Sequence, residues 1–122
     1  MQALLYIASA LTAVWGVAHL VATRGVVAGF GEITADNRRI VTMEWIVEGV
    51  ALVALGALVC AVTAAGGRGA AASAAYGVAA GTLVVLAGVS LFTGFRIAFL
   101  PFRLCPAIFL LSAALIAAGA WL

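Results

Sequence analysis

Three ionisable side chains lie within apolar stretches of this chain, at spacings that suit proton chemistry. Glu44 and Glu48 are four residues apart, so they share one face of a helix, and His19 lies in the preceding apolar stretch. A charge buried in hydrocarbon is energetically costly and is seldom kept without a use. A protonatable carboxyl beside a histidine in a dry site can move protons on a lipophilic molecule. We therefore predict that Glu48, Glu44 and His19 are acid–base residues.

Other polar and aromatic side chains complete the predicted site as ligand contacts. They are Arg96, Trp45, Trp15 and Thr12. Two neighbouring carboxylates repel each other, so either one carries a proton or His19 and Arg96 neutralise them. The second arrangement requires the first three helices to meet at one end of the protein.

Several other functions are disfavoured by the residues that the chain lacks. It has one histidine and no His-x-x-x-His spacing, so we predict no metal site. Motifs for nucleotide, P-loop or serine hydrolase sites are absent, and no cofactor is predicted. The net charge of +2 is spread thinly along the chain, which argues against nucleic-acid binding.

The composition indicates how these residues must be positioned. Of 122 residues, 67% are hydrophobic and 8% are charged, with a mean hydropathy of +1.31, far outside the range of a soluble domain. A membrane-spanning helix needs about 20 apolar residues. The sequence predicts an all-α integral membrane protein, a single domain over residues 1–122. Its four transmembrane helices are expected over residues 2–23, 35–65, 70–94 and 104–122.

The distribution of arginine predicts the orientation. With four crossings, Arg68 falls on one side of the membrane and the five other arginines fall on the opposite side. Cytoplasmic loops are enriched in basic residues, so both termini should face outward. We expect the protein in a bacterial cytoplasmic membrane, with the Glu/His cluster toward the cytoplasmic end. Counted from Arg39 along the helix, Glu48 would lie about 13 Å into the bilayer.

Local signals predict where the helices begin and end. Thr34 is placed to cap the second helix, and residues 25–31 are apolar and glycine-rich, which suggests backbone at the membrane interface. Three glycines at positions 66, 67 and 69 predict a tight turn. Pro101 and Pro106 are expected to break the turn between the third and fourth helices. Cys60 and Cys105 should lie at different depths, too far apart for a disulfide.

Small residues predict how the helices pack. Gly77 and Gly81 form a small-xxx-small pair on the third helix, and the first helix carries a strip that includes Ser9, Gly16 and His19. We expect these two strips to meet inside the bundle. The alternative is a homodimer formed through Gly77 and Gly81.

Two short segments resemble a known family. Residues 43–52 (MEWIVEGVAL), followed by LGAL at 55–58, are similar to the second helix of DoxX-like small membrane proteins, and residues 16–20 (GVAHL) are similar to the close of their first helix. The resemblance implies a four-helix bundle, in some members an accessory subunit of thiol or quinone redox systems. Of the matched positions, His19, Glu48 and Gly49 can be carried over. The chain has no Cys-x-x-Cys pair, which argues against independent redox activity.

Three functions are compatible with these residues. The first is a protein that binds a membrane lipid or another lipophilic small molecule and performs isomerisation, cyclisation or proton delivery on it. The second is a proton-coupled transporter that acts as a dimer. The third is a noncatalytic accessory subunit that docks a partner in a membrane redox complex. We favour the first, because the polar groups gather at one depth and do not line a path across the membrane.

Overall fold

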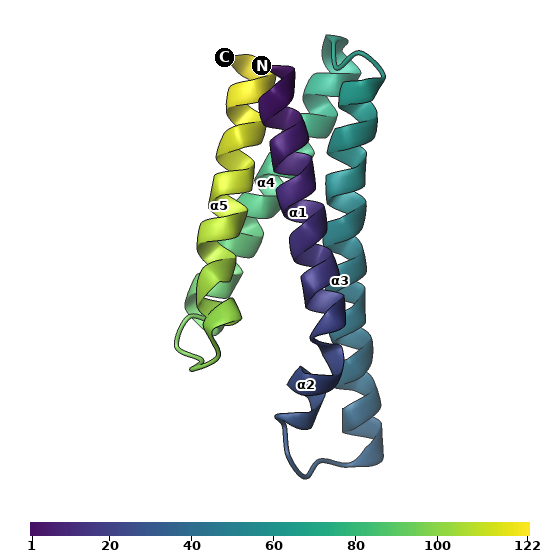
Figure 1. Ribbon diagram of the computed structural model, residues 1–122, viewed down its shortest axis with the longest axis vertical. Helices are drawn as coiled ribbons and strands as arrows, with labels where there is room; N and C mark the ends of the chain where they lie inside the picture. Colours follow the sequence, from purple (N-terminus) through teal and green to yellow (C-terminus); the bar gives the residue numbers. More distant parts are fainter.

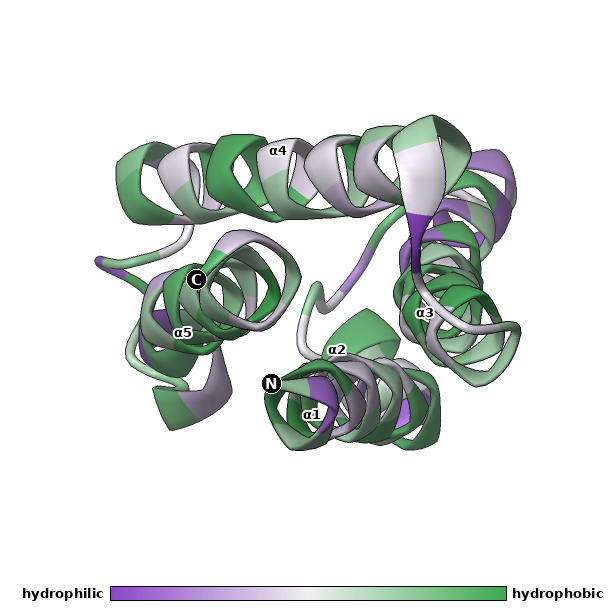
Figure 2. Ribbon diagram, turned by 90° about the horizontal axis from the view of Figure 1, so that it is seen from above, coloured by the Kyte–Doolittle hydropathy of each residue, from purple (hydrophilic) through white to green (hydrophobic).

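The computed structural model describes residues 1–122 and is entirely helical. Its long helices are α1 (Gln2–Val21), α3 (Ala35–Ala64), α4 (Gly69–Thr93) and α5 (Leu100–Trp121), and a short helix α2 (Thr23–Ala28) follows α1. All four long helices are long and apolar enough to cross a membrane, which indicates an integral membrane protein. Figure 2 shows apolar residues along most of each helix and polar ones mainly at the connections.

The helices form two hairpins that cover each other only in part. α1 packs mainly on α3, and α4 packs mainly on α5. α4 starts beside the end of α3 and crosses behind α1 to reach α5 (Figures 1 and 2). Both termini lie at the same end as the α3–α4 connection, as expected for four crossings (Figure 1). At the opposite end the two hairpins spread apart, leaving α2 without contact to α4 or α5.

Seven of the eight predicted helix ends hold to within two residues, and α3 begins at the predicted residue. The Thr34 side chain accepts a hydrogen bond of 3.1 Å from the Asn37 backbone nitrogen, which caps the helix. The predicted tight turn between α3 and α4 is confirmed. Gly66, Gly67 and Gly69 adopt positive φ angles of 109°, 60° and 86°, in the region that favours glycine.

The start of α5 corrects the sequence interpretation. The helix begins at Leu100, four residues earlier than predicted, and neither proline breaks it. Pro101 lies in the first helical turn, where a missing backbone N–H leaves no hydrogen bond unmade. Pro106 is inside the helix and buried. Residues 23–28 also form a helix, where only interfacial backbone was expected.

The predicted meeting of the two small-residue strips is wrong. The strip on α1 packs on α3, where a Cβ added at Gly16 would lie 2.8 Å from the Val53 backbone nitrogen. The Ser9 hydroxyl donates to the Gly56 carbonyl at 2.7 Å. The glycine face of α4 is open instead, with nothing within 4 Å of a Cβ added at Gly81. Helix α3 has its own glycines at positions 49 and 56, and these allow its backbone to approach α1 closely.

The core lies toward the end with the termini. It contains Leu52, Leu83, Phe109 and Ile116, each at most 1% exposed. Thr63 and Tyr76 are both buried there, and their hydroxyls form a 2.9 Å hydrogen bond.

Candidate functional site

His19 and Glu48 face each other across the α1–α3 interface. The His19 Nε2 atom lies 3.5 Å from a carboxylate oxygen of Glu48, and the two side chains are 7% and 43% exposed. The glycines that let the helices approach are adjacent to this pair in the sequence, since Gly49 follows Glu48 and Gly16 lies one turn before His19. A Cβ added at Gly49 would lie 3.2 Å from the Gly16 carbonyl oxygen. Close helix packing therefore positions the pair.

Trp45 holds His19 in place through two contacts. The two rings are stacked, with centroids 3.7 Å apart and an interplanar angle of 12°. The indole nitrogen of Trp45 also donates a 2.7 Å hydrogen bond to the backbone oxygen of His19. Trp45 is one turn before Glu48 on α3, so one face of that helix supplies both the partner and the support for the histidine.

The His19 Nε2 atom is buried and has no hydrogen-bond partner. The contact to Glu48 is too long and too poorly directed to count as a hydrogen bond. Buried polar atoms are nearly always paired, so an unpaired ring nitrogen beside a carboxyl calls for a functional explanation.

Two small pockets adjoin this histidine. The first, here called the histidine pocket, has a volume of about 190 Å³ and also includes Glu48, Ser90, Thr93 and Cys105. The second, the aromatic pocket of about 110 Å³, lies against Trp15, Trp45 and Phe102. His19, Trp45, Phe102 and Cys105 belong to both, so the two pockets share a wall.

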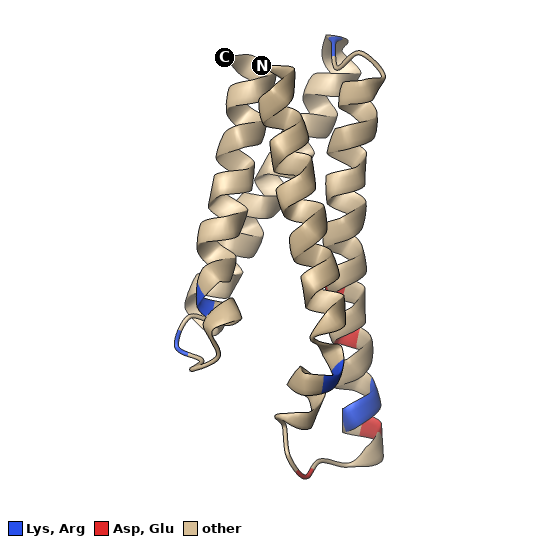
Figure 3. Cartoon of the chain, viewed as in Figure 1, with Lys and Arg blue, Asp and Glu red and all other residues tan.

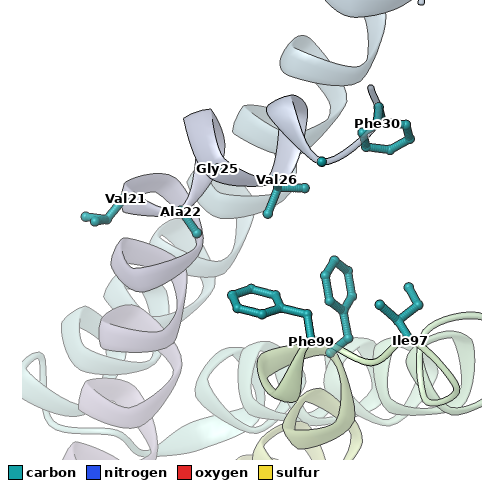
Figure 4. Close-up of a pocket in the computed structure, with 9 residues that line it drawn as sticks. Val21, Ala22, Gly25, Val26, Phe30, Ile97 and Phe99 are labelled. Carbon is teal, nitrogen blue, oxygen red and sulfur yellow. The ribbon is translucent and has the colours of Figure 1, made fainter. Parts of the chain in front are cut away.

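A larger pocket opens beyond them, between α2 and the α4–α5 connection. This apolar pocket has a volume of about 640 Å³. Figure 4 shows Ala22 and Val26 on one side, with Ile97 and Phe99 pointing toward them from the other. Phe102 lines the apolar, aromatic and histidine pockets alike, so the three lie around the same side chain.

The structure gathers some of the predicted site residues and separates others. His19, Glu48, Trp45 and Trp15 line adjoining pockets. Glu44 does not reach the histidine. It is exposed and lines a separate surface pocket of about 410 Å³, here called the glutamate pocket, together with Glu48.

Arg96 and Thr12 lie apart from the pair. Arg96 follows the end of α4, is exposed and forms no ion pair, because the helix stops at Thr93 and the chain turns away. The acidic residues of α3 and the basic residues of the α4–α5 connection thus lie on different hairpins (Figure 3). Thr12 is buried, and its hydroxyl donates to the Ala8 carbonyl of its own helix at 2.8 Å. Of the two arrangements that the sequence left open, neutralisation of the glutamates by both His19 and Arg96 is not found, because Arg96 forms no ion pair.

The pocket residues that were not predicted from the sequence include Phe102, Cys105, Ser90 and Thr93. Phe102 and Cys105 come from the first turns of α5, and only Cys105 fell within the predicted fourth helix. Ser90 and Thr93 form the last turn of α4, where their hydroxyls donate to the carbonyls of Leu86 and Val89. Their spacing of three residues puts both on one face, which was the only available signal.

No group of three or more His, Cys, Asp or Glu side chains is close enough to hold a metal ion. Cys60 and Cys105 are both free thiols. Comparison of the chain with protein-family models, curated proteins and solved structures finds no match. The interpretation of the site therefore depends on its own geometry.

Proposed function

We propose that this chain is a protein of the bacterial cytoplasmic membrane that binds a lipophilic small molecule and acts on it by acid–base chemistry. The observation that carries the proposal is the buried, unpartnered Nε2 atom of His19, which lies 3.5 Å from the Glu48 carboxyl at a pocket that shares Phe102 and Ile97 with the apolar pocket. A carboxyl and an imidazole so placed can exchange protons with a bound molecule in isomerisation, cyclisation or proton delivery.

The apolar pocket suits the hydrocarbon part of such a ligand. Its volume of about 640 Å³ falls in the range of small-molecule sites, which is about 300–1,000 Å³. Seven of its nine lining residues are hydrophobic. The pocket lies between the spread ends of the two hairpins, so a molecule dissolved in lipid can enter it sideways.

The orientation of the protein belongs to the proposal as well. Five of the six arginines lie at the end of the molecule that contains α2 and the α4–α5 connection. Arg68 lies alone at the opposite end, in the α3–α4 connection. The positive-inside rule then puts the site near the cytoplasmic face and both termini outside. On that placement Glu48 is an intramembrane residue.

The resemblance to DoxX-like proteins supports the assignment of His19 and Glu48 to the site. Its matched segments contain His19, Glu48 and Gly49, and the first two form the contact at the pocket while Gly49 packs against α1. We propose a distant relationship to these proteins on that basis.

The test is mass spectrometry of small molecules extracted from the purified protein in mild detergent. Wild type, Glu48→Gln and Glu44→Gln are compared, the last as a matched control one turn away on the same helix. We expect one lipophilic species in wild type and Glu44→Gln that is lost or chemically altered in Glu48→Gln. Bulk lipid alone, identical in all three samples, would contradict the proposal.

A proton-coupled transporter acting as a dimer is the second candidate, and the open face of α4 favours it. Gly81 and Gly88 have nothing within 4 Å of an added Cβ, so a second copy could approach closely there. Gly81→Leu should then convert a dimer into a monomer in analytical ultracentrifugation. A chain that is monomeric before and after the change contradicts this candidate. The third, an accessory subunit in a redox complex, predicts no bound ligand and tolerance of Glu48→Gln without its partner.

A further inference from the structure

The charges around the pockets restrict the head group of the ligand. None of the four pockets described above includes an arginine, and the chain has no lysine. Arg39 pairs with Asp36 at 3.1 Å, and Arg38 and Arg103 donate to the carbonyls of Gly31 and Ile97 at 3.2 and 3.1 Å. Arg24 and Arg96 adjoin the lining residues Gly25 and Ile97 in the sequence but do not line the pockets themselves. The charged side chains that do line the pockets are the two glutamates. An anionic head group would meet like charge and no counter-ion.

The polar groups are confined to one of the pockets around Phe102. The histidine pocket is lined by Glu48 and by His19, whose Nε2 atom is buried and has no hydrogen-bond partner. The hydroxyls of Ser90 and Thr93 already donate to backbone carbonyls of their own helix. The apolar pocket beyond Phe102 adds only valine, alanine, glycine, isoleucine and phenylalanine. A molecule with one small polar group and a hydrocarbon body matches this division.

A hydroxyl suits the His19 imidazole and the Glu48 carboxylate, which both lack hydrogen-bond partners, better than a carbonyl does. It can accept a hydrogen bond from the imidazole N–H and at the same time donate one to the carboxylate. A carbonyl oxygen only accepts, and it would leave the Glu48 carboxylate without a donor. The separation of 3.5 Å between His19 and Glu48 leaves no room for an oxygen between them, so a hydroxyl oxygen that contacts both must lie to one side of the pair.

We propose that the ligand is an uncharged lipid alcohol whose hydroxyl bridges His19 and Glu48. This inference rests on the proposed function and narrows it to one class of molecule. Phe102 lines the apolar, aromatic and histidine pockets. It contacts the ligand at the point where the polar head of the ligand joins the hydrocarbon body.

The test compares head groups on constant skeletons by native mass spectrometry at neutral pH. The probes are farnesol, farnesal, farnesoic acid and farnesyl phosphate, with oleyl alcohol and oleic acid as a second skeleton. We expect each alcohol to bind best, with the acid and the phosphate weaker by at least about tenfold because they bring like charge to Glu48. Glu48→Gln should reduce this preference, and Glu32→Gln, at an exposed glutamate outside the four pockets, should leave it largely unchanged.

Equal or tighter binding of the acid, the phosphate or the aldehyde would overturn the alcohol assignment. Failure of both alcohols to bind would overturn it too. If the wild-type protein nevertheless retains a lipophilic species that Glu48→Gln loses, the proposed function stands and only the ligand class is wrong. If no such species is found either, both proposals fail together.

Discussion

Trp45 is the residue on which the geometry of His19 depends most directly. It stacks on the imidazole and hydrogen-bonds to the backbone of the same residue, so it restrains both the ring and the helix that carries it. An aromatic pair contributes about 0.5–1.5 kcal/mol beyond its burial. Trp45 also lines the histidine, aromatic and glutamate pockets, which makes it a positioning residue for the whole site.

Trp45→Phe should show the contribution of the hydrogen bond separately from that of the ring stacking. Phenylalanine keeps a ring in the stack but removes the indole N–H that binds the His19 carbonyl. We expect the free energy of unfolding in detergent to fall by about 1 kcal/mol and the retained ligand to decrease. Trp121→Phe is the control, because that indole is half exposed and forms no hydrogen bond. Equal loss of ligand in both variants would argue against a positioning role for Trp45.

At the scale of the helices, the α1–α3 interface brings the pair together. Gly16 faces the backbone of α3 so closely that an added Cβ would lie 2.9 Å from the Gly49 carbonyl oxygen. Backbone cannot move aside as a flexible side chain can, so a methyl group there must push the helices apart. His19 lies one turn further along α1, where such a displacement would lengthen its contact to Glu48.

Gly16→Ala should therefore lower stability and weaken the site together. Overpacking of this kind costs about 1–3 kcal/mol. Gly81→Ala is the matched control, since its Cβ would enter open space and alanine favours the helix by up to about 1 kcal/mol. Thermal unfolding in detergent and retention of the extracted ligand measure the two effects. An unchanged Gly16→Ala protein would show that α1 and α3 do not depend on this contact.

The whole molecule is closed at one end and open at the other. Buried residues such as Tyr76 and Ile116 fill the end with the termini, and the hydroxyls of Thr63 and Tyr76 join α3 to α4 there. At the other end α2 and the start of α5 enclose the apolar pocket without touching.

Filling the pocket should block binding without unfolding the protein. Gly25 lines the apolar pocket, and a Cβ there meets nothing within 4 Å, so Gly25→Leu adds bulk to the pocket wall without a clash at its Cβ. We expect reduced ligand retention with little change in stability. Ala57→Leu, at an exposed position of α3 outside the pockets, is the control.

Cysteine labelling gives a second measurement of the same effect. Cys105 lines the histidine and aromatic pockets, whereas Cys60 lines none of the four described. Bound ligand should slow the reaction of Cys105 with a membrane-permeant maleimide and leave Cys60 unaffected. In Gly25→Leu that protection should be lost. Protection that persists in this variant would place the ligand elsewhere.

The sequence alone determined the helical class, the number of long helices and most of their ends. Apolar runs, the Thr34 cap and the glycine turn at 66–69 act over a few neighbouring residues, so they can be interpreted locally. The start of α5 was mispredicted because a proline can begin a helix as well as end one. His19 and Glu48 were predicted because ionisable residues are rare in apolar segments.

Only the tertiary structure decided which of these groups meet. α1 carries one strip of small residues, but two other helices offered glycines to pack against it, and the choice of α3 over α4 follows from contacts between distant segments. That choice pairs His19 with Glu48, leaves Arg96 on the other hairpin and brings Phe102 and Cys105 to the pocket. Helix pairing depends on how whole surfaces interlock, which no local pattern of residues encodes.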